Sequence, residues 1–198
     1  QDSFGMNMVA LVDGQPRLLN LREMIDAFVS HRREVVTRRT VFDLRKARER
    51  GHILEGLAVA LSNVDEVIAL IKRAPAPADA KRELVARSWP SPLVREMLSR
   101  AAAEQFRPEG LAPEFGLKED GYRLSEEQAQ AILELRLQRL TGLERDKIQS
   151  EYTELMERIK DLLDILAKES RVLQIIKDEL REIQKKYRNH CWSYFNVL

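Results

Sequence analysis

Residues 124–143 read Leu-Ser-Glu-Glu-Gln-Ala-Gln-Ala-Ile-Leu-Glu-Leu-Arg-Leu-Gln-Arg-Leu-Thr-Gly-Leu, and the predicted fold is organised around this stretch. Ser125 and Gln128 have the spacing of a capping box, in which a hydroxyl and an amide side chain satisfy backbone N–H groups at a helix start. Gly142 is placed to end the helix, because a residue without a Cβ readily adopts the left-handed conformation of a C-terminal cap. We therefore predict one short helix between these marks.

The apolar residues of this helix do not all lie on one side. A wide face carries Ala129, Ile132, Leu133, Leu137 and Leu140 at helical spacing. Ala131 and Leu135 point nearly the opposite way. A helix that is apolar on more than one side usually packs against two surfaces, and one of them can belong to a second copy of the chain. An ordinary core helix in a small helical domain is the alternative, and this pattern alone does not separate the two.

The composition is that of a helix-rich protein. Of the 198 residues, 44% are hydrophobic and 33% are charged, with only 8 Gly and 7 Pro. The formal net charge of +1 indicates no acidic partner for the chain as a whole, so a basic site would have to be local. No apolar run approaches the roughly 18–20 residues that span a bilayer, and no secretory signal pattern is present. One cysteine, Cys191, cannot form an internal disulfide, so we expect a cytoplasmic protein without a membrane segment.

The first 19 residues are predicted to form a strand and a turn that lead in from an upstream region. Residues 4–13 have the composition of a strand, and Gly14-Gln15-Pro16 that of a turn. The strand needs a partner, which is either Arg17-Leu18-Leu19 or a segment outside this sequence. The sequence starts abruptly, as a piece of a longer protein would.

A first long helix is predicted over residues 20–73. Asn20 and Glu23 have the spacing of its N-terminal cap, and no proline occurs before Pro75. A helix of about 50 residues is roughly 75 Å long, far longer than one in an ordinary globular domain. Its apolar residues recur at coiled-coil spacing: Leu21, Ile25, Phe28, Leu54, Leu57, Leu61, Val64, Ile68 and Ile71.

A second long helix is predicted over residues 144–187. Its apolar residues also step by three and four: Ile148, Tyr152, Leu155, Ile159, Leu162, Leu166, Leu173, Ile176, Leu180, Ile183 and Tyr187. Glu169 interrupts the series, so we expect the coil to be loose there. Glu169 is therefore a candidate hinge, as are Gly51 and Gly56 in the first helix, because glycine is a weak point at which a helix can bend.

The predicted fold is mainly α: a long antiparallel two-helix coiled-coil stalk with a small globular helical dimerisation knob at its tip. Residues 74–143 between the long helices form the knob. Within it, Asp120-Gly121 is a tight-turn pair that would join residues 115–117 to residues 122–124 in a hairpin. Residues 188–198 are interpreted as a non-native or disordered tail.

The middle of the first long helix is basic. Two interpretations are open: an ordinary solvated face, or a surface that meets DNA phosphates electrostatically. The candidate DNA-facing residues are Arg32, Arg33, Arg38, Arg39, Arg45 and Lys46.

No pattern of catalytic, cofactor-binding or metal-binding residues is recognisable. The three histidines, His31, His52 and His190, are far apart and fit no metal-ligand spacing, even with Cys191. No glycine-rich phosphate loop occurs. We expect this chain to carry no catalytic residue, cofactor site or metal site of its own.

Four motifs resemble the A subunit of the bacterial DNA gyrases, which are type IIA DNA topoisomerases. They are residues 4–11 (Phe-Gly-Met-Asn-Met-Val-Ala-Leu), residues 31–40 (His-Arg-Arg-Glu-Val-Val-Thr-Arg-Arg-Thr), residues 47–57 (Ala-Arg-Glu-Arg-Gly-His-Ile-Leu-Glu-Gly-Leu) and residues 128–144. The resemblance extends over about residues 1–187. The length of the segment between the two long helices is more similar to gyrase than to topoisomerase IV.

The resemblance implies that the intact enzyme cuts one DNA duplex, passes a second through and reseals the first, with negative supercoiling driven by ATP. It implies that ATP and Mg²⁺ are bound by the partner, which is the gyrase B subunit, and that this region forms the stalk and the exit gate, or C-gate, of a homodimer. The family's catalytic tyrosine follows an arginine, and no tyrosine of this chain does: Tyr122, Tyr152, Tyr187 and Tyr194.

A two-fold gate requires the same patch on both copies of the chain. We predict that this patch contains Ile132, Leu133, Arg136, Leu137 and Leu140. The alternatives are the gate region of the A subunit of topoisomerase IV, a coiled-coil adapter that dimerises without DNA, and a basic helical module that binds duplex DNA.

Overall fold

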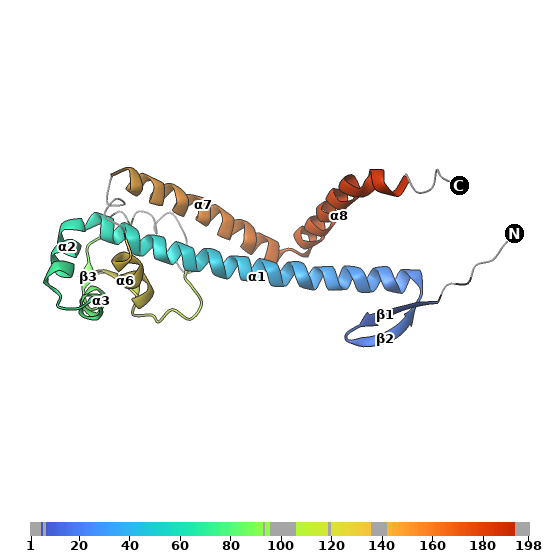
Figure 1. Cartoon of the computed structure of the whole chain (residues 1–198), viewed down its shortest axis with the longest axis horizontal. Helices are drawn as coiled ribbons and strands as arrows, with labels where there is room; N and C mark the ends of the chain where they lie inside the picture. The colour runs from blue at the N-terminus through green and yellow to red at the C-terminus, as the bar shows by residue number, and fades with distance from the viewer. Residues whose placement is uncertain are drawn as a thin grey trace. The chain divides into compact units, whose positions relative to one another are not determined.

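The computed structural model describes residues 5, 7–92, 94–95, 106–118, 120–135 and 142–192. These residues are mainly helical and include a long first helix, which confirms that the chain is mainly α (Figure 1). The chain divides into two compact units: unit 1 is Gln1–Phe42 with Leu163–Leu198, and unit 2 is Asp43–Leu162. None of the helices in the described part of the chain is long and apolar enough to cross a membrane.

Unit 1 begins with a β-hairpin. Strand β1 (Met8–Val12) pairs antiparallel with strand β2 (Gln15–Leu19), and Met8 lies opposite Leu19. The turn residues Asp13 and Gly14 have φ angles of 53° and 77°, and such positive angles are what a two-residue hairpin turn requires. Of the two partners considered for the first strand, the one within the chain is therefore correct.

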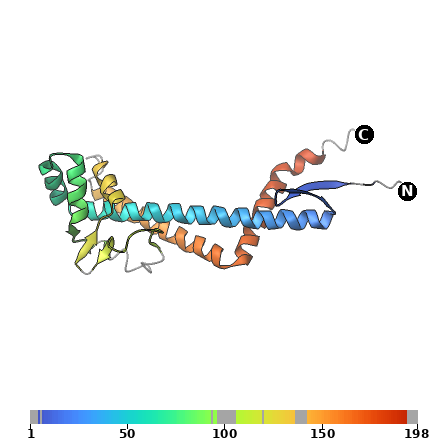
Figure 2. The same cartoon turned by 90° about the horizontal axis from the view of Figure 1, so that it is seen from below.

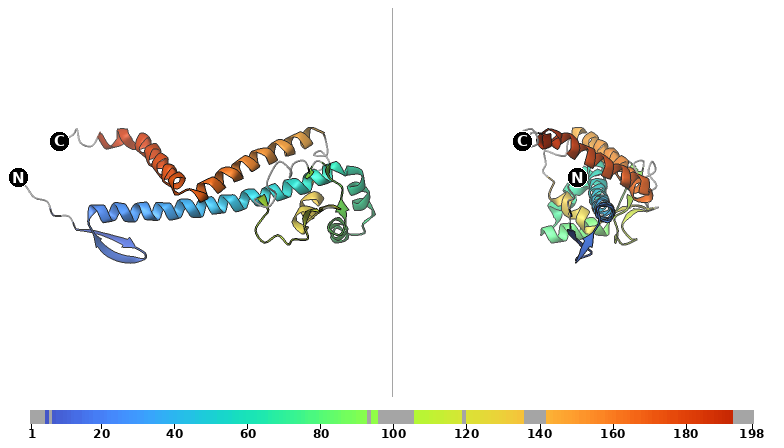
Figure 3. Two further views of the ribbon diagram at one scale, coloured as in Figure 1. Left: turned by 180° about the vertical axis from the view of Figure 1, so that it is seen from behind. Right: turned by 90° about the vertical axis from the view of Figure 1, so that its right-hand side faces the viewer.

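Helix α1 (Leu21–Ser62) begins as the sequence predicts and runs through both glycines without interruption (Figures 2 and 3). The backbone N–H of Glu23 donates to Asn20 Oδ1, and the backbone N–H of Asn20 donates to Glu23 Oε2, each at 2.9 Å. This reciprocal pair satisfies two of the backbone donors that a helix start leaves without partners.

The predicted helix over residues 20–73 is in fact two helices, because α1 ends at Ser62 and α2 (Val64–Arg73) follows. Asn63, between them, has φ −127° and ψ 40°. Its side-chain amide donates to the carbonyl oxygens of Val59 and Pro90, both at 2.9 Å. An asparagine side chain that bonds nearby backbone offers the chain an alternative to helix, which explains the break at this residue.

The second long helix is also divided, into α7 (Gly142–Ala167) and α8 (Glu169–Trp192). The break at Lys168 lies next to Glu169, where the sequence predicts a loose coil. It is bounded by ion pairs: Asp164 accepts from Lys168 at 2.5 Å and from Arg171 at 3.4 Å, and Arg33 lies 2.8 Å from Glu169. Because α8 continues to Trp192, residues 188–192 of the proposed tail are helical.

Within unit 1, α8 packs against the first half of α1. The contact has an apolar core of Val36, Ile165, Val172 and Ile176, with Ile175 at its side. Glu179 lies beside this core and accepts hydrogen bonds from both Arg32 and Arg39, the second at 2.6 Å. These hydrogen bonds, of which that from Arg39 contributes most, lower the pKa of Glu179.

Within unit 2, α1 and α7 run antiparallel. Asp43 pairs with Arg158 at 4.0 Å, and Arg50 with Glu151 at 2.7 Å, so the residue numbers rise along one helix as they fall along the other. Exposed ion pairs contribute little free energy, typically about 0–1 kcal/mol each. Their positions along the two helices nevertheless show that α1 and α7 are antiparallel.

The rest of unit 2 is a small layer of helices and short strands on the second half of α1. It contains α3 (Pro77–Ala86), α6 (Glu126–Leu133) and a sheet in the order β3 (Ser88–Trp89), β5 (Gly121–Arg123), β4 (Gly116–Lys118). Leu117 lies opposite Tyr122, as predicted for residues 115–117 and 122–124, but Gly121, predicted in the turn, is the first residue of β5 and pairs with Lys118. The Trp89 indole is buried and donates to the Leu84 carbonyl oxygen at 3.0 Å.

Candidate functional site

Helix α6 begins at the predicted capping box. The Gln128 backbone N–H donates to Ser125 Oγ at 3.3 Å, and the Ser125 backbone N–H donates to Gln128 Oε1 at 2.9 Å. The predicted end is wrong: α6 ends at Leu133, and Gly142 is the first residue of α7. The early end is closed by hydrogen bonds from the Glu134 and Leu135 backbones to carbonyls of the last turn.

Ile132 and Leu133 are the two predicted interface residues that the structure describes. Ile132 is buried, and Leu133 is half-buried. The other three, Arg136, Leu137 and Leu140, lie outside the described residues.

A buried network of hydrogen bonds fixes α6 against α1. The Gln128 side-chain amide donates to the His52 carbonyl oxygen at 2.6 Å and to the Tyr122 hydroxyl at 2.8 Å. His52 Nε2 lies 2.8 Å from Ser125 Oγ, and His52 Nδ1 lies 3.2 Å from Gln128 Nε2. All four side chains are buried, so each of these polar groups would lose its solvation without such partners.

The surroundings of His52 favour its neutral form. Its Nε2 lies within hydrogen-bond distance of Ser125 Oγ, and its Nδ1 faces Gln128 Nε2, whose two hydrogens bond the His52 carbonyl oxygen and the Tyr122 hydroxyl. Burial first and the positive charge of Arg107 second lower the pKa of His52 to about 4. His52 is therefore neutral at neutral pH.

Glu55 extends the network to α7. Its two carboxylate oxygens accept from the Tyr122 hydroxyl at 2.8 Å and the Tyr152 hydroxyl at 3.0 Å. Burial raises the pKa of Glu55, and the two phenolic hydrogen bonds and the charge of Arg107 oppose that rise. Sequence analysis missed this network: it assigned Tyr152 to an apolar seam, and the polar residues at 52, 55 and 122 are far apart in the chain.

The two glycines of α1 have different surroundings. A Cβ on Gly56 would lie 2.7 Å from Gln128 Cβ and Cγ, whereas a Cβ on Gly51 would meet only Met156 Cε, at 3.7 Å. Real Cβ atoms hardly ever approach another heavy atom to within 3.0 Å, so the missing side chain at 56 is what lets α6 approach α1. Gly56 thus has a packing role that the sequence-based hinge hypothesis did not include.

The surroundings of the two glycines predict different effects of Gly51→Ala and Gly56→Ala on the free energy of unfolding. Gly51→Ala is expected to raise the free energy of unfolding by about 0.5–1 kcal/mol, because alanine favours the helix. Gly56→Ala is expected to give a chain about 1–3 kcal/mol less stable than the Gly51→Ala chain, because Gln128 must move. Thermal unfolding of both variants checks this, and equal stability would contradict the close approach.

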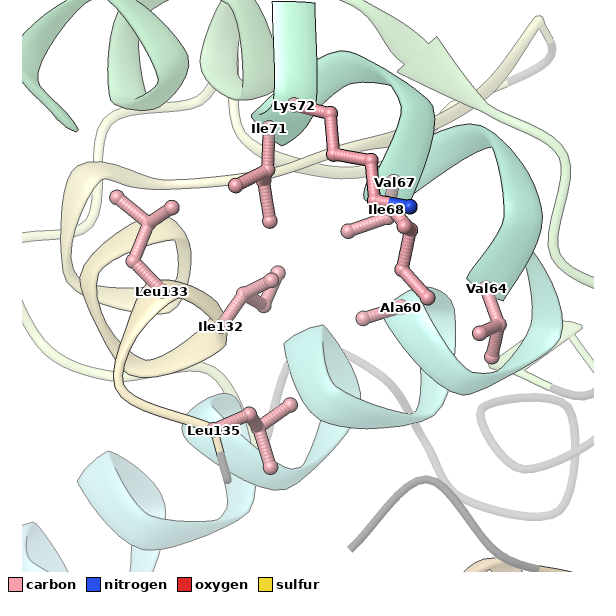
Figure 4. Close-up of a pocket in the computed structure, with 9 residues that line it drawn as sticks. All are labelled: Ala60, Val64, Val67, Ile68, Ile71, Lys72, Ile132, Leu133 and Leu135. Carbon is pink, nitrogen blue, oxygen red and sulfur yellow. The ribbon is translucent and has the colours of Figure 1, made fainter. Parts of the chain in front are cut away.

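An apolar pocket lies on the other side of α6. It has a volume of about 240 Å³ and is lined by residues from the end of α1, from α2 and from α6 with the turn after it (Figure 4). The lining residues are Ala60, Val64, Val67, Ile68, Ile71, Lys72, Ile132, Leu133 and Leu135. The pocket therefore contains both described members of the predicted interface, and Lys72 is the one charged side chain among its described lining residues.

The predicted DNA-facing residues are largely used in ion pairs. Their partners are carboxylates of α8 or of the same helix: Glu179 for Arg32 and Arg39, Glu169 for Arg33, Glu34 for Arg38 and Glu49 for Lys46. Arg45 is exposed and has no such pair among the described residues. The structure thus gives Arg32, Arg33 and Arg39 a role in holding α8, while Arg38, Arg45 and Lys46 remain on an outer surface.

No cluster of three or more histidine, cysteine, aspartate or glutamate side chains that could hold a metal ion occurs in the ranges described. The candidate site is the apolar pocket at α6, together with the buried network that positions the helix.

Comparison with known proteins gives the family. A family model for the A subunit of DNA gyrase/topoisomerase IV matches residues 1–181, and the chain belongs to this family of type II topoisomerase subunits. Among its relatives, the DNA gyrase A subunit of Pseudomonas aeruginosa is 58% identical over 187 residues, which are 94% of this chain and 20% of the relative.

Two further relatives are also DNA gyrase A subunits. That of Neisseria gonorrhoeae is 57% identical over 198 residues, which are 99% of this chain and 22% of the relative. That of Escherichia coli K12 is 61% identical over 152 residues, which are 77% of this chain and 17% of the relative. The chain thus spans about a fifth of the length of these relatives.

Proposed function

We propose that this chain forms the coiled-coil stalk and the exit gate, or C-gate, of a DNA gyrase A subunit. The intact enzyme would be an ATP-dependent type II topoisomerase of the bacterial cytoplasm that negatively supercoils DNA by double-strand passage. Its partners would be double-stranded DNA and the gyrase B subunit, which would bind ATP and Mg²⁺. This chain would supply no catalytic residue and would act by opening to release the transported duplex.

The stalk is supported by the helix pairings inside each unit. In unit 2 the ion pairs order α1 and α7 antiparallel, and in unit 1 α8 packs on α1 through the core around Val36. A pair of long helices has little core of its own, which is the build of a supporting stalk. The break at Lys168 is the favoured hinge, because Gly51 and Gly56 lie inside an unbroken helix.

The pocket at α6 is the single observation that carries the gate assignment. Its lining is almost wholly aliphatic, and Leu133, Leu135 and Ile71 keep part of their side chains exposed at its rim. Exposed apolar groups that gather at one place on a soluble protein mark interaction sites. A gate contact between two identical chains must hold closed and still be able to open. A modest apolar centre of this kind meets both needs.

Light scattering over a dilution series tests the gate. We expect the wild-type chain to be a dimer and Leu133→Asp to dissociate it at least about a hundredfold more readily, because a carboxylate cannot be buried in the apolar contact without a partner. Leu117→Asp is the matched control, since Leu117 is 37% exposed on β4 and does not line the pocket.

The control should dimerise like the wild type. A Leu133→Asp chain that dimerises as tightly as the Leu117→Asp chain would refute this placement of the gate.

The outer basic residues supply a second, independent test, in the intact enzyme. We propose that Arg38, Arg45 and Lys46 face the transported duplex, because phosphate contacts need exposed cations and no sequence readout. Replacing the three by glutamine should weaken duplex binding and make it less dependent on salt. Replacement of Arg32, which pairs with Glu179, is the control expected to disturb α8 instead.

A further inference from the structure

Two phenolic hydroxyls meet on one carboxylate between α7 and α1. The hydroxyl of Tyr152, on α7, donates to Glu55 Oε1 at 3.0 Å, and the hydroxyl of Tyr122, on β5, donates to Glu55 Oε2 at 2.8 Å. Both tyrosine side chains are buried, and Glu55 is half-buried on α1. Each carboxylate oxygen thus has its own donor, and the two donors come from different elements of unit 2.

The hydrogen bonds continue from Tyr122 to the start of α6 in a fixed order of donors and acceptors. The hydroxyl oxygen of Tyr122 accepts from the Gln128 side-chain amide at 2.8 Å, and Gln128 Oε1 accepts from the Ser125 backbone N–H at 2.9 Å. Tyr122 therefore donates on one side and accepts on the other. Hydrogen bonds linked in this way polarise one another in a poorly solvated interior, so the strength of each bond depends on its neighbours.

Tyr152 differs in kind from its neighbours along the helix. The other buried side chains in the described part of α7 are apolar: Met156, Ile159, Leu162 and Ile165. Apolar contacts have no preferred direction, so they tolerate small shifts of one helix along another. A hydrogen bond holds both a distance and an angle within narrow limits. The Tyr152 hydroxyl therefore selects one alignment of α7 against α1.

We propose that Tyr152 is a positioning residue for α6: through Glu55 and Tyr122, its hydroxyl holds Gln128 in the place that the alignment of α7 on α1 defines. This inference rests on the proposed function, in which α7 belongs to the stalk and α6 to the gate, and it adds the side chains that link the two. A shift of α7 that breaks the bond between Tyr152 and Glu55 loosens α6, although the Tyr152 hydroxyl bonds only Glu55 among the described residues.

Amide hydrogen exchange over α6 tests this link, because exchange reports the local opening of a helix. Tyr152→Phe removes one hydroxyl from α7 and should raise the exchange rates of the α6 amides about tenfold, measured by mass spectrometry at one protein concentration. Glu151→Gln is the matched control, since it breaks the ion pair of the adjacent residue with Arg50 across the same two helices. It should leave exchange over α6 unchanged.

A double variant tests whether the effect passes through Tyr122. Tyr122→Phe alone should raise exchange over α6 at least as much as Tyr152→Phe, because it breaks the same series of bonds nearer to Gln128. Adding Tyr152→Phe to Tyr122→Phe should then cause little further rise, whereas two independent effects would multiply. Helix α8, in unit 1, is the internal reference and should exchange at the wild-type rate in all variants.

The link would be overturned if exchange over α6 were the same in Tyr152→Phe as in Glu151→Gln, or if it rose equally over α6 and α8. A double variant whose rise is the product of the two single rises would overturn it too. None of these results bears on the dimer measured with Leu133→Asp, so the proposed gate would stand. Conversely, a Leu133→Asp chain that still dimerises removes the gate assignment and leaves the link between the helices in place.

Discussion

Replacing Gln128 by methionine is expected to lower the free energy of unfolding by about 3–5 kcal/mol, the largest effect of any single substitution considered. Methionine has a similar size, so the loss is one of hydrogen bonds and not of volume. The change leaves the Ser125 N–H without its acceptor, and the His52 carbonyl and the Tyr122 hydroxyl without a donor. Each such buried group costs about 1–3 kcal/mol when its partner is removed.

The same helix supplies the control for this experiment. Gln130 is exposed, and among the described residues its side-chain amide donates only to the Glu134 carboxylate, at 2.8 Å. Gln130→Met should therefore change the free energy of unfolding by no more than about 0.5 kcal/mol. Urea unfolding at one fixed protein concentration measures both variants, because association also contributes to apparent stability. Equal losses in the two variants would mean that the buried network contributes nothing specific.

Acidification is expected to destabilise the chain through His52. The folded state holds the pKa of His52 at about 4, against 6.5 for the free side chain, so the unfolded state binds the extra proton first as the pH falls. Stability should therefore be complete above about pH 6.5 and decline towards pH 4, with a total loss of about 3 kcal/mol from this group. A protonated His52 would also place an N–H at Nδ1 against the Gln128 amide donor.

The free energy of unfolding, measured against pH for the wild type and for His52→Gln, isolates the contribution of His52, because the variant lacks the titrating ring. Glu55, whose folded-state pKa is raised, acts in the opposite direction, since its stabilising effect is present at low pH and is lost as the pH rises through that pKa. The wild type and His52→Gln both contain Glu55, so its effect cancels when their free energies of unfolding are subtracted.

His31→Gln, at an exposed position of α1, is the control and should follow the wild type at every pH. If wild type and His52→Gln lose stability in parallel between about pH 7 and pH 4.5, His52 is not the group responsible.

The local features of the fold were predictable from sequence. The caps at Asn20 and Ser125 and the hairpin register around Tyr122 were all found, because each depends on residues a few positions apart. A break between two helices does lie next to Glu169, since a charged residue at a seam position is visible in the pattern itself.

The break at Asn63 and the ion pairs of the basic residues were missed for one reason: the deciding contact comes from elsewhere in the chain. The break at Asn63 depends on the carbonyl of Pro90, which lies 27 residues away. The candidate DNA-facing arginines Arg32 and Arg39 meet Glu179, 147 and 140 residues along the chain, so a stretch of positive charge in the sequence is partly a set of ion pairs in the fold. Periodicity and spacing within a short segment do not reveal partners that lie far away in the chain.

The proposed interface residues were chosen in part by pattern and in part by resemblance. Ile132 and Leu133 do line an apolar pocket, whereas the contributions of α2 were not foreseen, because they need the bend at Asn63 to bring α2 beside α6. Lys72 is the clearest case: in sequence it is one more charge in a charged segment, and only the pocket shows that it lies at the rim of an apolar surface.

The capping box at Ser125 restricts which amino acids this position tolerates. At an ordinary helix start, serine, aspartate and asparagine are nearly interchangeable. Here the Ser125 hydroxyl also bonds the buried ring of His52, so aspartate would bring a negative charge into the interior and draw a proton onto that ring. A library of variants at this position, selected for folding at neutral pH, should therefore retain serine and threonine and reject the acidic cap that helix statistics alone would admit.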